Sequence, residues 1–290
     1  MASMRDIKRR KESVQSTSQI TKAMKLVSTV KLQKAKGKAD STKPYFKCMY
    51  DTVAQILKKA GNIDHPYLKA NNSNSKKAII LISSNKGLAG GYNANMVKLV
   101  TEMDANKEDI VIYAVGRKAK DTLARKGYKI ERDYSDVVND ALYSDAMIIG
   151  RQVIQDYSEG KFGEIYLAYT EFKNTVVHIP KLIKLLPFTL EGSEDDDKEK
   201  TIDDLTLMNF EPDEEEALDM IIPKYINSLI YGGIVEAVAS ENGARMQAMD
   251  SATSNAETMI SDLSLKYNRA RQASITQEIT EIVAGASAIN

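Results

Sequence analysis

Residues 235–270 read VEAVASENGARMQAMDSATSNAETMISDLSLKYNRA, and this stretch decides the fold. Eleven residues step along it at alternating intervals of four and three: Val235, Ala239, Asn242, Met246, Met249, Thr253, Ala256, Ile260, Leu263, Tyr267 and Ala270. This is a heptad pattern, which keeps one face of a helix against a partner helix. Many of the eleven side chains are small or polar, so the seam lets the partner come close but buries little apolar area.

The helix that carries this seam is predicted to run from about Ser228 to Asn290, because no proline interrupts that stretch. A helix of this length spans about 90 Å at about 1.5 Å per residue. Its partner must therefore be another long helix or a surrounding sleeve. Upstream, residues 210–216 resemble a helix start, with a proline and carboxylates in the first turn. Pro223 follows and is predicted to kink or interrupt the helix before Tyr225.

The first 60 residues predict a second long helix. Its predicted apolar face consists of Met4, Ile7, Val14, Thr17, Ile20, Met24, Val27 and Val30, resumed by Phe46, Met49, Tyr50, Val53, Ile56, Leu57 and Ala60. Gly37 and Pro44 lie between the two groups and predict a bend or a loosened turn. The segment holds 15 Lys and Arg against 4 Asp and Glu, although the whole chain carries 40 of each kind. This basic face suits either a solvated helix or a grip on phosphate backbones.

A different pattern occupies the middle of the chain. Short apolar runs predict strands over residues 78–82, 110–116, 164–170 and 176–186, and helical stretches are predicted over 93–103, 118–126 and 141–157. Alternation of strands and helices over about 110 residues is typical of a small Rossmann-like sheet. The predicted fold class is therefore α/β: a long antiparallel coiled coil of the N- and C-terminal helices plus a Rossmann-like α/β domain.

Residues 83–93, SSNKGLAGGYN, form a glycine-rich loop between a predicted strand and a predicted helix, which is where phosphate-binding loops occur. The loop lacks the Gly-Lys-Ser/Thr ending of a P-loop and the Gly-x-Gly-x-x-Gly spacing of a dinucleotide site. We interpret it as a tight structural turn, and nucleotide binding remains the alternative.

Catalytic, metal and membrane signals are weak. His65 and His178 have no Asp, Cys or second His at catalytic or ligand spacing, and the single Cys48 rules out an internal disulfide and a cysteine-based metal site. No apolar run approaches the roughly 18 residues that a membrane span needs. We expect no catalytic residue, no cofactor and no metal.

The polar residues of both terminal helices follow a specific order. Residues 240–249 read SENGARMQAM, residues 268–278 read NRARQASITQE, and near the N-terminus RDIK (5–8) precedes ITKAMKLV (20–27). Periodicity does not specify such an order on exposed faces. In these segments the chain resembles the γ subunit of F-type ATP synthases, the central shaft of a rotary motor. Two ends that match one family make nucleic-acid binding improbable, and a match that begins at Arg5 leaves no transit peptide to expect.

The resemblance implies partners and a mechanism. The shaft would enter a ring of three α and three β subunits, and the α/β domain would meet the ε subunit and the membrane c-ring, without nucleic acid and without membrane insertion. Turning an asymmetric shaft would couple ion flow to ATP synthesis or hydrolysis at β. The protein would be a peripheral membrane protein at the cytoplasmic face of the bacterial cell membrane. Two other classes remain: a nucleotide-binding α/β protein with coiled-coil arms, and an unrelated coiled-coil scaffold.

The resemblance also implies contact residues. Met24, Lys25 and Arg245 match family positions near the acidic lever segment of β, and Arg271, Gln272 and Thr276 match positions that face the β catch loop. Ordinary seam packing is the alternative for Met24, and solvent exposure is the alternative for Arg271 and Gln272. The predicted division of the chain is a shaft helix (1–70), an α/β domain (71–190), an acidic linker (191–212) and a second shaft helix (213–290).

The seam is predicted to change phase near its end. After Ala270 the apolar positions are Ile275, Ile279, Ile282, Ala286 and Ile289, so the step from Ala270 to Ile275 is five residues. Such a shift turns the apolar stripe to a new direction. Because the first helix starts near Ala2, it is expected to run out before it covers the new stripe, and the final turns are expected to stand alone.

Overall fold

The structure is a computed structural model that describes residues 4–60, 65–68, 75–188 and 214–289. In chain order its helices and strands are α1 (Met4–Ala60), β1 (Lys77–Ile82), α2 (Tyr92–Thr101), β2 (Ile110–Val115), α3 (Arg117–Arg125), β3 (Lys129–Asp133), α4 (Tyr143–Ser158), β4 (Glu164–Phe172), β5 (His178–Leu186) and α5 (Glu214–Ile289). The chain divides into two compact units, residues 31–244 and residues 1–30 with 245–290, and both long helices contribute to each.

The larger unit, residues 31–244, is built on a five-stranded sheet of order β3-β2-β1-β4-β5. The first four strands run parallel and β5 pairs antiparallel to β4 through a hairpin. The central strand β1, KAIILI, is buried on both faces, as strands of a covered parallel sheet are. This arrangement confirms the predicted Rossmann-like sheet.

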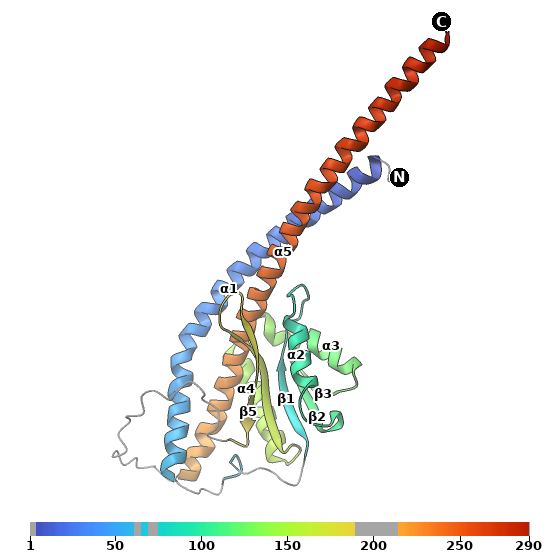
Figure 1. The fold of residues 1–290 in the computed structure, drawn as a ribbon. Helices are drawn as coiled ribbons and strands as arrows, with labels where there is room; N and C mark the ends of the chain where they lie inside the picture. The colour runs from blue at the N-terminus through green and yellow to red at the C-terminus, as the bar shows by residue number, and fades with distance from the viewer. Residues whose placement is uncertain (1–3, 61–64, 69–74, 189–213, 290) are drawn as a thin grey trace. The chain divides into compact units, whose positions relative to one another are not determined.

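Two helical layers cover the two faces of this sheet (Figure 1). On one face Ile79 and Leu81 pack with buried residues of α2 and α3, including Met96 and Leu123. On the other face Ile80 and Ile82 pack with residues of α4 and α5, where the fully buried stripe of α5 is Leu218, Ile222, Ile226, Ile230 and Ile234. Alternate residues of one strand thus serve two cores, because successive side chains of a strand point to opposite faces.

The first part of α5 lies directly on the sheet. A Cβ atom at Gly233 would sit 3.2 Å from Leu167 and 3.4 Å from Ile82, so glycine permits this close approach. Further toward its start, the Tyr225 ring lies 6.2 Å from the Tyr50 ring of α1 and 5.6 Å from the Phe188 ring. The predicted α1 residues Val53 and Ile56 are buried here, at 0% and 2% exposure.

The smaller unit, residues 1–30 with 245–290, consists of the start of α1 and the end of α5. The two helices lie side by side and run in opposite directions, since Thr21 contacts Thr253 while Lys25 contacts Asp250. The predicted antiparallel pairing of the terminal helices is confirmed.

Both long helices are continuous at positions where the sequence predicted an irregularity. Helix α1 spans Met4–Ala60, as predicted, and remains helical through Gly37 and Pro44, where a bend or a loosened turn was expected. Helix α5 starts at Glu214 and continues through Pro223, where an interruption was expected. Proline removes one helical hydrogen bond, but the buried residues Leu218, Ile222 and Ile226 pack the helix against the sheet on both sides of Pro223.

The predicted strands and helices of the middle region are found, with ends shifted by a few residues. Strand β3 was missed because its sequence, KIERD, is mostly exposed and shows no apolar run. The predicted acidic linker lies outside the described residues, and the proposed four-part division of the chain remains a prediction.

Candidate partner-contact surfaces of the helix pair

A buried pair of threonine hydroxyls joins α1 to α5 in the smaller unit. Thr21 Oγ1 lies 2.7 Å from Thr253 Oγ1, and the two residues are only 8% and 9% exposed. One turn along, Lys25 Nζ donates a hydrogen bond to Asp250 Oδ1 at 2.6 Å. In an antiparallel pair each step back along α1 is matched by a step forward along α5. This register therefore places Met4 beside Ala270.

All eleven residues of the predicted α5 seam are buried or half-buried. Its members are buried at Val235, Ala239, Asn242, Met249, Thr253 and Ala256, and half-buried at Met246, Ile260, Leu263, Tyr267 and Ala270. Between Met246 and Ala270 most buried and half-buried residues fall on the predicted seam, which confirms the heptad there, and burial decreases toward Ala270. Between Val235 and Arg245 every residue is buried or half-buried, so burial does not single out the seam in that part.

The predicted apolar face of α1 is correct at some positions and wrong at others. Met4, Ile7, Val14, Met24, Met49 and Tyr50 are half-buried, and Val53 and Ile56 are buried, as predicted. Ile20, Val27 and Val30 are 58%, 57% and 67% exposed, whereas Thr21 and Ser28 are buried. The buried residues that continue the stripe into the larger unit are Leu32, Ala35 and Ala39. Small and polar side chains let the two helices approach closely at Thr21 and Ser28, and Ile20, Val27 and Val30 lie outside the seam.

Two of the six predicted contact residues, Met24 and Lys25, lie within about one turn of Thr21 on α1, and a third, Arg245, lies about two turns before Thr253 on α5. Met24 and Lys25 are half-buried, and Lys25 is bound to Asp250. Arg245 is 8% exposed and lies between one and two turns before Asp250. The role of Asp250 was missed, although its position just after the seam residue Met249 places it opposite Lys25 in this register.

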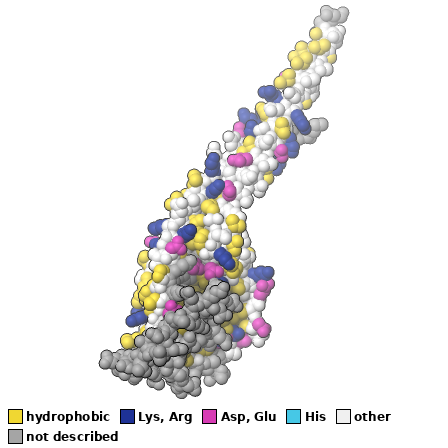
Figure 2. Space-filling model, turned by 60° about the vertical axis from the view of Figure 1, so that its left-hand side comes forward, with side chains coloured by type: hydrophobic (Ala, Val, Ile, Leu, Met, Phe, Trp, Pro, Cys, Tyr) yellow, Lys and Arg dark blue, Asp and Glu magenta, His cyan; other side chains and the backbone are white. Residues whose placement is uncertain are grey.

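The other three predicted contact residues, Arg271, Gln272 and Thr276, are all exposed. They lie beyond Ala270, the residue that this register places beside Met4, where the described part of α1 begins. Among residues 271–287 only Ser274 is half-buried. Ile275, Ile279, Ile282 and Val283 are 47%, 55%, 70% and 58% exposed, and Figure 2 shows hydrophobic side chains along this end of α5. The expected lack of cover over the final turns is confirmed.

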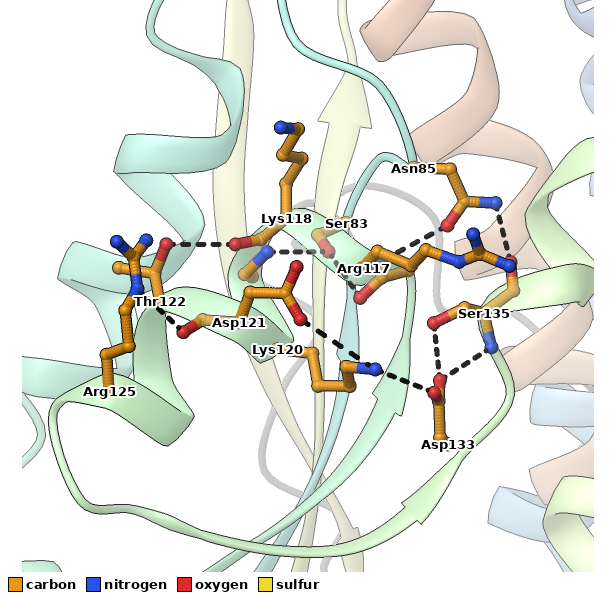
Figure 3. A network of polar contacts seen from close by, with 12 residues as sticks. Ser83, Asn85, Arg117, Lys118, Lys120, Asp121, Thr122, Arg125, Asp133 and Ser135 are labelled. Carbon is orange, nitrogen blue, oxygen red and sulfur yellow. Dashed lines mark hydrogen bonds and ion pairs between the residues drawn. The ribbon is translucent and has the colours of Figure 1, made fainter.

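The first residues of the glycine-rich loop in the larger unit accept hydrogen bonds from the start of α3 (Figure 3). Arg117 N donates to Asn85 Oδ1 at 3.1 Å, Lys118 N to the Ser84 carbonyl at 3.0 Å, and Ala119 N to Ser83 Oγ at 3.3 Å. These are the first amides of α3, and free amides at a helix N-terminus are what phosphate-binding loops use. In this chain the three amides are already occupied.

The turn from β2 into α3 leaves no room for a ligand at this point. Gly116 has φ 119°, and a Cβ atom there would lie 2.0 Å from the Ser83 carbonyl oxygen. Beside it, Asn93 Oδ1 accepts hydrogen bonds from Ser84 N at 3.0 Å and Ser84 Oγ at 2.9 Å. The interpretation of the loop as a structural turn agrees with this packing.

Charged groups next to this turn are paired with one another (Figure 3). Lys120 Nζ donates to Asp133 Oδ2 at 2.8 Å, and the backbone amide and hydroxyl of Ser135 donate to Asp133 Oδ1. Burial opposes ionisation of Asp133, but the hydrogen bonds from Lys120 and Ser135 outweigh it and lower the pKa of the carboxyl group. The network holds β3 against α3.

A cleft of about 450 Å³ lies between α2 and α3. Its polar lining consists of Asn93, Lys98, Thr101, Lys118, Thr122 and Lys126, without a carboxylate, histidine or cysteine. Across the residues that the structure describes, no group of three or more His, Cys, Asp or Glu could hold a metal ion. His65 instead binds Asp219 at 3.2 Å and accepts the Tyr67 amide at 3.2 Å. No described helix has the length and apolar character to cross a membrane.

The fold and these surfaces define a class of protein: an antiparallel two-helix shaft joined to a small sheet domain. A family model described as ATP synthase matches residues 3–289. The ATP synthase gamma chain of Lachnoclostridium phytofermentans is 69% identical over 292 residues and covers 100% of both chains. The sodium-ion-specific gamma chain of Acetobacterium woodii is 40% identical, covering 99% of each. The chain belongs to the family of ATP synthase gamma chains, and as such it is a subunit of an ATP synthase.

Solved structures show the same fold at low sequence identity. The rotor of the Euglena gracilis mitochondrial ATP synthase superposes with a TM-score of 0.68 at 18% identity, over 94% of this chain and 98% of that one. The paired helices and the sheet domain therefore recur in a rotor whose sequence has diverged widely.

Proposed function

We propose that this chain is the rotating central stalk of an F-type ATP synthase. It couples ion flow through the membrane sector to ATP synthesis or hydrolysis at the catalytic β subunits, and it regulates their activity. The observation that carries the proposal is the surface of the helix pair, where large apolar side chains of both helices face outward. Ile20, Leu26 and Val30 of α1 and Met259 and Leu265 of α5 are all more than half exposed. Such surfaces mark protein contacts.

The partners proposed for the chain are the α and β subunits of the catalytic ring, the ε subunit and the c-ring. Structures with this fold carry the titles central stalk and c-ring in Tetrahymena thermophila, and OSCP, F1 and c-ring in Euglena gracilis. The paired helices suit insertion into a ring because a pair of helices is narrow and its sides carry different side chains. A shaft with different side chains on each side contacts each of three identical β subunits differently, and rotation then favours a different β conformation at each site in turn.

The proposed contact residues fall into two groups. Met24, Lys25 and Arg245 would meet the acidic lever segment of β, and Arg271, Gln272 and Thr276 would meet its catch loop. The second group is supported by exposure beyond the end of α1, which leaves its polar groups available for hydrogen bonds. In the first group, Lys25 is already bound to Asp250, so any bond to an acidic β segment has to compete with that carboxylate.

We further propose that the chain has no catalytic residues of its own. Asn85 and Ser83 of the loop that resembles a phosphate site accept hydrogen bonds from the first amides of α3, and the cleft between α2 and α3 contains no acid–base pair. The alternative, a nucleotide-binding α/β protein with coiled-coil arms, lacks a site in the described residues to support it. The expected location is the cytoplasmic face of the bacterial cell membrane, as a peripheral protein held by the rest of the complex.

Co-purification tests the proposed function. An affinity-tagged chain, expressed in its native cells, should bring down α and β chains in about threefold molar excess over itself, together with ε. Replacing both Arg271 and Gln272 by alanine should leave this composition unchanged, because the longer seam still holds the shaft. Recovery of the tagged wild-type chain without α and β chains would refute the proposal.

A further inference from the structure

The turn-side end of the β4–β5 hairpin packs against α5 at a glycine. Phe172 ends β4, His178 begins β5, and the two residues are paired across the hairpin. Their rings lie 6.0 Å apart, and both approach α5 at Gly243. One turn earlier on α5, Ser240 Oγ donates a hydrogen bond to the Thr170 carbonyl at 3.1 Å. Two successive turns of the helix are thus held by the hairpin.

Gly243 is needed for this contact. A Cβ atom at Gly243 would lie 2.8 Å from Cε1 of His178 and 3.5 Å from Cε2 of Phe172. Glycine inside a helix is less favourable than alanine, so its presence here requires a compensating contact. Gly37 of α1 provides the contrast, because a Cβ atom there would meet nothing within 4 Å.

His178 fills the space beside Gly243 as a neutral ring. Both of its ring nitrogens are buried, and neither has a partner at full hydrogen-bond geometry within the described residues. The Thr175 backbone lies close enough to raise the pKa of the imidazole somewhat, but burial has the larger effect. Burial lowers the pKa of the imidazole, which keeps it uncharged at neutral pH. The ring therefore acts by shape, wedged between Phe172 and the backbone of α5.

The position of this contact along α5 is also informative. The unit that contains the sheet ends at Ala244, one residue after Gly243, and α5 continues unbroken into the other unit. The hairpin therefore grips α5 just before the helix leaves the sheet domain. Any twist carried along α5 has to pass this point to reach the sheet.

We propose that His178 and Gly243 form a clasp between the hairpin and α5 that fixes the angle of α5 on the sheet domain. Phe172 backs the His178 ring, and the Ser240 hydrogen bond holds the turn before it. The clasp itself follows from the contacts in the sheet domain alone. Its role in transmitting twist between the shaft and the sheet domain rests on the proposed rotor function.

A double-mutant cycle on the full-length chain tests the clasp. Gly243→Ala should lower the midpoint of thermal unfolding by about 2–4 °C, the shift expected for a modest steric conflict in a chain of this size. In a His178→Ala background the conflict disappears, so Gly243→Ala should then raise the midpoint. The matched control is Gly37→Ala, which gives the gain from helix propensity alone. If Gly243→Ala raised the midpoint as Gly37→Ala does while His178 is present, the clasp would be ruled out.

The assembled complex tests the mechanical role. The number of ions pumped per ATP hydrolysed should fall in the Gly243→Ala variant. It should recover at least partly in the Gly243→Ala/His178→Ala double variant, because the methyl group of the alanine at position 243 then occupies space that the His178 ring has left. Unchanged pumping in Gly243→Ala, despite a positive cycle, would overturn the role in transmitting twist. If the wild-type chain failed to assemble with α and β chains, the rotor function would fail while the cycle would still decide the clasp.

Discussion

Asp156 of α4 is a carboxylate kept ionised inside the sheet domain. It is 3% exposed and accepts hydrogen bonds from Tyr113, Gln152 and Lys161, with Lys161 Nζ at 2.6 Å. Burial alone would raise its pKa, but these three donors outweigh burial and lower the pKa of the carboxyl group. The side chain ties the middle of β2 to the end of α4.

Asp156→Asn should lower the free energy of unfolding by about 2 kcal/mol, because it removes the charge from hydrogen bonds that a buried tyrosine and a lysine make. Since the pKa in the folded state is below that of the unfolded chain, ionised Asp156 stabilises the fold above about pH 4. That contribution is lost as the pH falls through the folded-state pKa, so the variant should lose part of the acid sensitivity. Denaturant unfolding between pH 3 and pH 7 measures both effects.

Glu159→Gln is the matched control for this prediction. Glu159 is the other acidic partner of Lys161, at 2.8 Å, but it lies on the surface. Solvent screens such a pair, so the variant should unfold at the wild-type denaturant concentration. If both variants lost the same free energy of unfolding, burial of Asp156 would not increase its contribution to stability.

The sequence predicted the buried face of α5 better than the buried face of α1. In α5 the heptad includes Met249, Ile260 and Leu263, so an apolar pattern revealed the correct face. In α1 the same search selected Ile20 and Val27, which are exposed. The buried α1 residues Thr21 and Ser28 carry no apolar signal, and only the partner helix determines that they face inward. Strand β3 was missed for the same reason, because its pairing with β2 and not its own composition holds it in the sheet.

Truncation after Gln277 and alanine replacement of Arg271 and Gln272 should have different effects. Truncation removes the exposed apolar residues Ile279, Ile282 and Val283, which we interpret as a bearing that centres the shaft. It should loosen assembly while leaving substantial ATP hydrolysis. Arg271→Ala/Gln272→Ala should reduce turnover with assembly intact, because it removes directional hydrogen bonds. Subunit composition by native mass spectrometry and steady-state ATP hydrolysis measure the two effects.

The control for the double alanine variant is Lys266→Ala/Asn268→Ala. It removes a basic and an amide side chain from exposed positions of the same helix, one turn or so earlier. This control should hydrolyse ATP at the wild-type rate. Should truncation abolish hydrolysis in a fully assembled complex while Arg271→Ala/Gln272→Ala runs normally, the bearing interpretation would have to be abandoned.

The whole chain should bind neither ATP nor NAD at millimolar concentration. The amides at the start of α3 are occupied by Ser83, Ser84 and Asn85, and the glycine-rich loop has neither the Gly-Lys-Ser/Thr ending of a P-loop nor the glycine spacing of a dinucleotide site. Isothermal titration calorimetry of the purified chain should therefore give only the heat of dilution. Saturable binding that Gly90→Ala abolishes would show that the loop is a nucleotide site.

Function was accessible from sequence at the level of the family and not at the level of contacts. The order of polar residues in SENGARMQAM and NRARQASITQE identified the family, which the comparisons bear out. Sequence did not reveal that Lys25 is bound to Asp250, or that His178 packs on Gly243. Both contacts join residues that are far apart in the chain, and a single sequence does not show which distant residues lie close together in space.

The unbroken helices restrict how the length of this shaft can vary. Helix α1 has 57 residues and α5 has 76, and each passes through both units without an interruption. One residue added between the units would rotate every side chain beyond it by about 100° and turn the seam away from its partner. Seven added residues leave a rotation of only about 20°, provided that the other helix gains seven as well. Viable shaft lengths are therefore spaced by about 10 Å, the rise of seven helical residues, and a relative with a longer or shorter shaft should carry matched seven-residue blocks in both helices.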